Sequence, residues 1–381
     1  MRKIFLTAIA LLSMASASVF GMYGVDTDWI NFLTHGNQFR ARLDQLGFTL
    51  GNDTIKGTFG FDNNANYGGV YGSLFSTADG MYYDFKPSIS MGLGYTSSLI
   101  SVGVGYNVTL GPKGQRYNGK ADPKTVQEAA HTPVLVLNAM DNAFRMAIPI
   151  QVYVLNDKNE AGIKNNITMV SVDSQFRYYT GLDMLPQIRL YLRYGGGNYK
   201  AGDISGKIGE TFGFDFRLYF GSMVEEVALQ PYVKLTYDGA LGKYHDKTRI
   251  EAVKVMNSLN IDNSGYFAVP TTLQLAKSAW NLNLVAGLGL TANSDIVSLY
   301  LEPTLGLKVT QEGSADKNTK ELYELGYGVY AEIYITPLKN LEWYFEASIG
   351  NVGVVNNNQV VAGKGLGFAG TTGITWYLPA L

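Results

Sequence analysis

Apolar residues occupy nearly every second position in two neighbouring stretches of this chain, 85–95 and 100–110. Glycine, serine and other polar residues fill most of the positions in between. A period of two predicts β-strands with one apolar face and one polar face. Each stretch is also long enough to cross a bilayer as a tilted strand, which takes roughly 9 to 11 residues.

The same alternation returns from residue 55 to residue 378. Counted along the chain, it predicts about 14 antiparallel strands, with 12 or 16 as the alternatives, because bacterial barrels usually have an even number. The sequence thus predicts an all-β protein that forms a transmembrane up-and-down antiparallel β-barrel. A soluble β-sandwich shows the same alternation and is the competing interpretation.

The links between these stretches alternate in length. Short links are predicted at 97–98, 140–142, 181–186, 221–226, 293–295 and 337–340. Long links are predicted at 62–82, 111–130, 156–166, 196–207, 239–279, 311–320 and 350–365. Outer-membrane barrels have short periplasmic turns and long extracellular loops, whereas a sandwich has no reason to segregate its loops by length. If the last strand ends in the periplasm, every long loop faces outward.

The start of the chain predicts export. Arg2 and Lys3 precede the apolar stretch 4–12, and mostly small residues follow over 13–18. This is the layout of a secretory signal peptide, which we assign to residues 1–21. The apolar stretch is too short for a spanning helix, and no longer one follows, so the mature chain would enter a membrane as strands.

The stretch 22–47 does not alternate and lies between the signal peptide and the barrel, which we assign to residues 48–381. It is predicted to form a short helical N-terminal segment, in or beneath the periplasmic mouth, as a partial plug. A first helix would run through Leu33, and a second would begin at Asn37. The alternative is a single bulged strand over 38–50.

Four aromatic residues are expected near strand ends, where the interfacial girdles of outer-membrane barrels lie. They are Trp343, Trp376 and Tyr178 at periplasmic ends and Trp280 at an outer end. The competing interpretation makes them core aromatics of a soluble β protein.

The polar faces of the strands carry charges that divide in two along the chain. The middle strands present a basic wall of Arg145, Arg177, Arg189, Arg193, Arg217 and Lys234. The later strands present an acidic wall of Glu302, Glu324, Glu332, Glu342 and Glu346. Because consecutive strands are neighbours in an up-and-down barrel, the walls would create a transverse field in a water-filled pore. Alternatively, the charges pair across the lumen and with Asp173, Asp215 and Lys308, and fill it without conducting.

Glycines on the same inward face form two smooth patches. They are Gly92, Gly94, Gly103, Gly105, Gly287, Gly289, Gly326 and Gly328. The favoured interpretation is that small inward residues let the sheet coil and close. The alternative is that they make room for the N-terminal segment.

Composition agrees with an exported barrel and gives little support to enzyme chemistry. Only 16% of the residues are charged, the formal net charge is -2, and there is no cysteine. Disulfides are therefore excluded, and the charge balance gives no reason to expect nucleic acid as a partner. No catalytic, metal or cofactor site is predicted, because His35, His131 and His245 lie far apart in no known motif. A rim histidine, His131 or His245, leaves an outer-membrane enzyme as a remote alternative.

Four stretches carry a family resemblance. They read FGMYG at 20–24, WINFLTHGNQFRAR at 29–42, GLGLTANSDIVSLY at 287–300 and GITWYLP at 373–379. In them the chain resembles the variable surface protein (Vsp) family of outer-membrane proteins of intestinal spirochaetes. The resemblance implies an abundant surface antigen with related paralogues that is assembled into larger complexes, and it brings no catalytic residues. One departure is the ending Pro-Ala-Leu at 379–381, where barrels usually end in an aromatic residue.

The expected function is therefore that of a variable surface antigen in the outer membrane, with exposed loops on the cell surface. The loops 111–130 and 239–279 are the best candidates to face the host, because long loops tolerate change at small entropic cost. A general diffusion porin is the alternative. The expected partners are outer-membrane lipid, copies of the chain or its paralogues, and host antibodies.

Overall fold

The computed structural model describes residues 29–42, 45–63, 87–110, 127–158, 164–224, 226–242, 275–353, 359–360 and 367–378. The predicted signal peptide 1–21 lies outside these residues, as do large parts of the predicted long loops. Within the described part of the chain, no helix is long and apolar enough to span a membrane.

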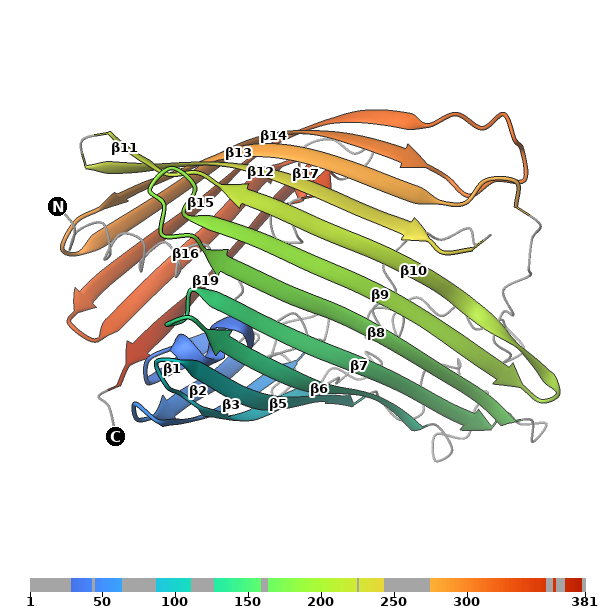
Figure 1. Cartoon of the computed structure of the whole chain (residues 1–381), viewed down its shortest axis with the longest axis horizontal. Helices are drawn as coiled ribbons and strands as arrows, with labels where there is room; N and C mark the ends of the chain where they lie inside the picture. The colour runs from blue at the N-terminus through green and yellow to red at the C-terminus, as the bar shows by residue number, and fades with distance from the viewer. Residues whose placement is uncertain are drawn as a thin grey trace, which may run out of the picture.

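Sixteen strands form one antiparallel sheet that closes on itself (Figure 1). They are β1 (Gln38–Arg42), β2 (Gln45–Gly51), β3 (Ile55–Asn63), β4 (Pro87–Tyr95), β5 (Ile100–Leu110), β6 (Gln127–Ala139), β7 (Phe144–Lys158), β8 (Lys164–Tyr179), β9 (Gln187–Ala201), β10 (Ile204–Tyr219), β12 (Val227–Ala240), β13 (Trp280–Asn293), β14 (Val297–Gln311), β15 (Leu322–Leu338), β16 (Leu341–Gly350) and β19 (Gly367–Tyr377). Strands that follow one another in this series pair side by side, and β1 pairs with β19 to close the ring. The predicted fold class is confirmed, and the strand number is 16, one of the two stated alternatives to 14.

Three short strands lie outside this ring. The strand β11 (Ser222–Val224) pairs with the start of β12, in a link that was predicted to be a plain turn. The strands β17 (Val352–Gly353) and β18 (Gln359–Val360) pair only with each other. They lie within the predicted long link 350–365.

The two faces of the sheet show the polarity of a membrane barrel. On β5, Ile100 and Val104 are 48% and 59% exposed, whereas Ser101 and Thr109 are 2% and 0% exposed. Apolar side chains therefore point outward and polar side chains point inward. A soluble sandwich buries its apolar faces instead, so that interpretation is wrong. A closed ring also leaves no unpaired strand edge in lipid, where each unsatisfied backbone group costs several kcal/mol.

This polarity reverses at the outer ends of β7, β8 and β9. There the inward side chains of Leu155, Ile167 and Met169 are buried and apolar. The outward residues Asn166 and Lys200, which lie directly opposite each other, are exposed and polar. An exposed polar outer face does not suit lipid, so we expect the lipid-facing band to end before these residues.

The described residues of the N-terminal segment confirm only part of what was predicted for 22–47. A short helix, η1 (Trp29–Thr34), forms where the first helix was expected. The second helix from Asn37 is wrong, because β1 and β2 form a hairpin there, and the alternative of one strand over 38–50 is wrong for the same reason. The barrel wall thus begins at Gln38 instead of residue 48.

The predicted long link at 196–207 is also wrong. Strands β9 and β10 continue through it and are joined by a two-residue turn in which Gly202 has a φ of 61°. One glycine of this stretch serves packing against the neighbouring strand. A Cβ atom on Gly206 would lie 2.8 Å from the hydroxyl oxygen of Tyr199, so only glycine leaves room for that ring.

Candidate functional site in the barrel interior

Five of the six residues of the basic wall, all except Arg193, form a straight row across five neighbouring strands. Arg145 of β7 lies opposite Arg177 of β8, which lies opposite Arg189 of β9. The row continues through Arg217 of β10 to Lys234 of β12. Like charges directly opposite each other destabilise a sheet, so this row needs compensating groups.

One half of the row is compensated by a buried carboxylate. Asp215 is 0% exposed and lies 2.8 Å from Arg217, 3.3 Å from Lys234 and 3.5 Å from Arg193. Arg193 also lies 3.6 Å from Asp173 and 3.7 Å from Asp238. Three cations and three carboxylates thus form one balanced network on β8, β9, β10 and β12.

We expect Asp215→Ala to destabilise the barrel by about 3–5 kcal/mol, because it removes the shared partner of two buried cations, Arg193 and Lys234, and of the partly buried Arg217. Urea unfolding of the protein refolded in lipid vesicles, followed by gel mobility of the unheated protein, measures this loss. The matched control is Glu210→Ala on the same strand, whose carboxylate pairs with Lys207 on the exposed outer face and should matter little. Equal effects of the two substitutions would contradict the buried network.

The other half of the row is held by neutral groups and by the N-terminal helix. Arg145 Nη1 and Arg177 Nη1 donate to Asn31 Oδ1 of η1 at 2.8 Å and 3.1 Å. Arg189 Nε donates to Gln187 Oε1 at 2.8 Å, and its guanidinium lies 4.5 Å from the ring centroid of Tyr219. Hydrogen bonds to Asn31 therefore connect the basic wall to η1.

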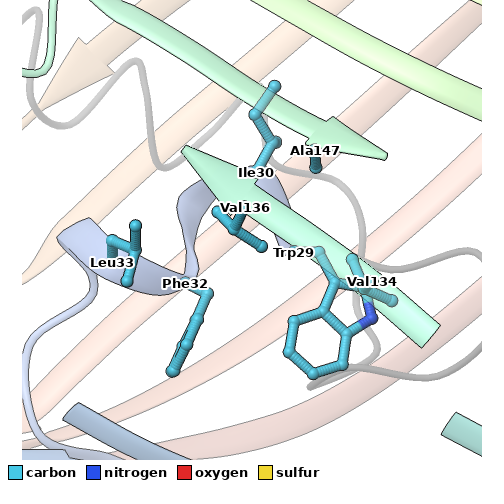
Figure 2. Packing of buried hydrophobic residues seen from close by; sticks show 7 residues of the cluster. All are labelled: Trp29, Ile30, Phe32, Leu33, Val134, Val136 and Ala147. Carbon is cyan, nitrogen blue, oxygen red and sulfur yellow. The ribbon is translucent and has the colours of Figure 1, made fainter. Parts of the chain in front are cut away.

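The apolar side of η1 packs on the inward face of β4 to β7. Figure 2 shows Trp29 beside Val134 and Ile30 beside Ala147, and all four residues belong to one buried cluster. A Cβ atom on Gly105 would lie 2.4 Å from the Trp29 ring. η1, which belongs to the predicted plug, thus contacts the barrel wall through the Trp29 ring. A residue larger than glycine at position 105 would block this contact.

The glycine patches make room for rings rather than only allowing closure. Cβ atoms on Gly92, Gly94, Gly103 and Gly105 would all crowd Trp29, Phe32 or Leu33 of η1. For this patch the alternative interpretation, room for the N-terminal segment, is correct. In the second patch, Gly287 and Gly289 lie against the rings of Tyr232 and Tyr300.

The acidic wall lies on β14, β15 and β16 and is held by tyrosines. Glu302 accepts hydrogen bonds from Tyr232, at 2.7 Å, and from Tyr300. Glu332 accepts from Tyr330 and, at 2.9 Å, from Tyr334. Each tyrosine on the same strand as its glutamate lies two positions away and so shares its inward face.

The remaining members of the acidic wall also face inward. Glu346 lies opposite Glu332, and Glu324 lies opposite Lys308. Glu342 accepts a hydrogen bond from Tyr377 at 3.3 Å. Among the described residues, no ion pair joins the acidic wall to the basic wall. Among the described residues, the predicted pairing therefore occurs between the basic wall and Asp173 and Asp215, but not between the two walls.

A model of the Serpulina hyodysenteriae variable surface protein family matches residues 2–377. The chain belongs to this family. No curated protein matches it. Among solved structures it is similar to in-vitro folded OmpT, an outer membrane protein of Vibrio cholerae, at 9% identity and a TM-score of 0.32. That likeness covers 87% of this chain and 98% of the other.

Family and fold together make this variable surface protein an outer-membrane surface protein. The four aromatic residues predicted as girdles lie near strand ends. Trp343 and Tyr178 are 47% and 39% exposed next to short links, Trp376 is 56% exposed near the end of β19, and Trp280 begins β13 at the opposite end of the barrel wall. Contact of these residues with the lipid interface stays a prediction.

The histidines of this variable surface protein are not brought together in the described structure. His131 lies on the outer face of β6, where its Nδ1 is 2.5 Å from the hydroxyl of Tyr106. His35 follows η1, and His245 lies outside the described residues. No group of three metal-ligating side chains occurs among the residues that the structure describes.

Proposed function

We propose that this variable surface protein is a display scaffold with a filled interior, rather than a diffusion pore. The observation that carries the proposal is the burial of inward charges. Arg177, Asp215 and Glu332 are 2%, 0% and 0% exposed, although they point into the ring of strands. Charged side chains that line an open aqueous pore would be exposed to solvent.

Different parts of the chain hold the barrel in lipid and form the long links, and this separation supports a display function. The backbone ladder and the apolar outer face hold the wall in lipid, so neither constrains the sequence of the long links. Variation in these links would change what a host antibody meets without weakening the barrel. On this proposal the partners are outer-membrane lipid, copies of the chain or its paralogues, and host antibodies, and the protein is not an enzyme.

Recording across a planar lipid bilayer tests the filled interior. We expect the folded protein to give no stepwise ion current under conditions in which a known diffusion porin does. Slower gel migration after heating than before it would verify that the same preparation contains closed barrels. Regular current steps from that preparation would overturn the proposal and favour the porin alternative.

A further inference from the structure

The short links at one end of the barrel carry exposed apolar side chains, although turns are usually built from Gly, Pro, Asn, Asp and Ser. Seven described links join the ring strands at the end where β19 finishes: β2 to β3, β4 to β5, β6 to β7, β8 to β9, β10 to β12, β13 to β14 and β15 to β16. Each link contains, or directly adjoins, a large apolar side chain that is more than half exposed. These side chains form an apolar rim, which consists of Ile55, Leu99, Met140, Leu182, Met184, Val224, Ile296 and Leu338.

Exposed polar residues adjoin the apolar rim. Asp141 follows Met140, and Asp183 lies between Leu182 and Met184. Scattered exposed apolar residues are normal on a protein, but a set that recurs on every one of these links indicates an interaction surface. Apolar and polar side chains on one short turn suit a boundary between lipid and water, where amphipathic groups are enriched.

The distribution of the apolar rim favours lipid over a protein as its partner. Each link joins two neighbouring strands of a closed ring, so the links follow one another around the whole circumference. A leaflet surrounds a barrel on every side, whereas a docked protein needs one contiguous patch. The apolar rim also continues the exposed outer face, because Leu99 and Ile296 directly precede the exposed Ile100 and Val297.

Strand length places this end of the barrel independently. On the outer face of β9, the apolar and aromatic side chains end before Asn198, which lies opposite the exposed polar residues Thr168 and Lys207. From Gln187, where β9 begins, to Asn198 the strand extends about 37 Å at about 3.4 Å per residue. A tilt of about 40° leaves about 29 Å across the membrane, which is close to the height of about 25 Å of an outer-membrane apolar band. The band therefore reaches Gln187 and the link 180–186 beside it, which carries two residues of the apolar rim.

We propose that the apolar rim inserts into the lipid leaflet at its end of the barrel, with the apolar side chains at the acyl-chain boundary and the neighbouring carboxylates in water. The partner of this surface is the lipid itself, and not a soluble protein. Both boundaries of the barrel are then fixed, so the extra length of β7 to β10 projects from the membrane at the opposite end, where the long links lie. The insertion does not depend on a filled interior, so its failure would leave the proposed display function and its conductance test unchanged.

Single cysteines measure the insertion, because the chain has none of its own. Leu99→Cys, Met184→Cys and Leu338→Cys place a thiol on three separate links, and each thiol carries an environment-sensitive fluorophore. The labelled barrels are placed in phosphatidylcholine nanodiscs, which leave both ends open to the solution. Gel mobility before and after heating verifies that each variant is folded. Two quenchers are compared: iodide in the water, and phosphatidylcholine with a nitroxide on the acyl chain near the headgroup.

We expect the nitroxide lipid to quench the three rim labels more strongly than a label at Val104→Cys, an exposed outer position in the middle of β5. Moving a Leu or Met side chain from water into an apolar environment is favoured by more than about tenfold, so iodide should quench the rim labels at least about ten times less than a label at Lys200→Cys. The matched controls are the exposed neighbours Ser98→Cys, Asp183→Cys and Lys339→Cys. They should be quenched more by iodide and less by the nitroxide lipid.

Three outcomes would overturn the insertion. In the first, iodide quenches the rim labels as strongly as the label at Lys200→Cys, which would place the apolar rim in water. In the second, the nitroxide lipid quenches the labels on only one or two of the three links, as expected of a barrel that dips into lipid on one side. In the third, iodide reaches the rim labels in nanodiscs but not in outer-membrane fragments, which would assign the apolar rim to a protein partner.

Discussion

Replacing Ala41 with proline should prevent the ring of strands from closing. Ala41 lies in β1, where it faces Ile374 of β19 on one side and Leu46 of β2 on the other. Proline has no N–H to donate and is disfavoured in central strands, although the longer strands β12 and β14 accommodate Pro231 and Pro303. The pairing of β1 with β19 is the seam that closes the barrel. Because β1 has only five residues and is paired on both sides, the loss of backbone hydrogen bonding at one residue interrupts this seam. In lipid, the backbone groups left unpaired would cost several kcal/mol each.

We expect most of the Ala41→Pro protein to migrate as unfolded chain without heating, whereas the wild type should migrate as a compact barrel. Ala41→Val is the matched control, since it keeps the N–H and adds a side chain that suits a strand. A proline variant with the gel mobility and urea midpoint of the wild type would show that β1 is not needed for closure.

This seam is also where the sequence was misread. Phe39, at an outward position of β1, and Leu46 and Phe48 of β2 belong to two strands that run in opposite directions. Because the chain reverses between them, the outward apolar residues fall at odd-numbered positions in β1 and at even-numbered positions in β2. The resulting spacing of apolar residues looks helical, so the hairpin was predicted as a helix and the strand count came out two short. The other strands keep one phase between clear links and were found.

The glycines at 195–197 show a second limit of pattern reading. Three glycines in a row favour a loop when only the local sequence is considered. In the barrel they lie within β9. Nearby, Gly206 of β10 makes room for the ring of Tyr199. A glycine that relieves crowding by a distant ring looks the same in the sequence as one that turns the chain.

The two walls and their partners Asp173 and Asp215 were predicted from the sequence, but the tyrosine and asparagine partners were not. A period of two fixes the face of each charged residue, so the members of both walls all point inward as expected. The register between strands has no such local signal, so the alignment of Arg145, Arg177 and Arg189 emerges only when the strands are paired. One partner signal was present and missed. Tyr330, two positions from Glu332 on the same strand, had to share its inward face.

The contact between η1 and the glycine patch gives the second large effect that we expect. A Cβ atom on Gly105 would lie 2.4 Å from the Trp29 ring, and one on Gly94 would lie 2.3 Å from Leu33. Trp29 and Leu33 are each 3% exposed, so neither can turn away without leaving the buried cluster. Overpacking costs about 1–3 kcal/mol per site. Gly94→Val/Gly105→Val should therefore shift η1 away from the wall while the ladder of β4 and β5 stays intact.

The absence of cysteine from the chain makes this shift measurable. With Ile30→Cys as the only thiol, maleimide labelling of the folded barrel reports how often η1 leaves its place, because Ile30 is 0% exposed and is not one of the side chains that the new valines would crowd. Each 1.4 kcal/mol changes an equilibrium about tenfold, so the valine variant should label at least about ten times faster than its parent. The control is Gly57→Val, where the nearest atom to a new Cβ is 3.8 Å away. Fast labelling only in the crowded variant would show that the glycines hold η1 in place. Equal rates in all three proteins would mean that the rings of η1 do not depend on the space these glycines leave.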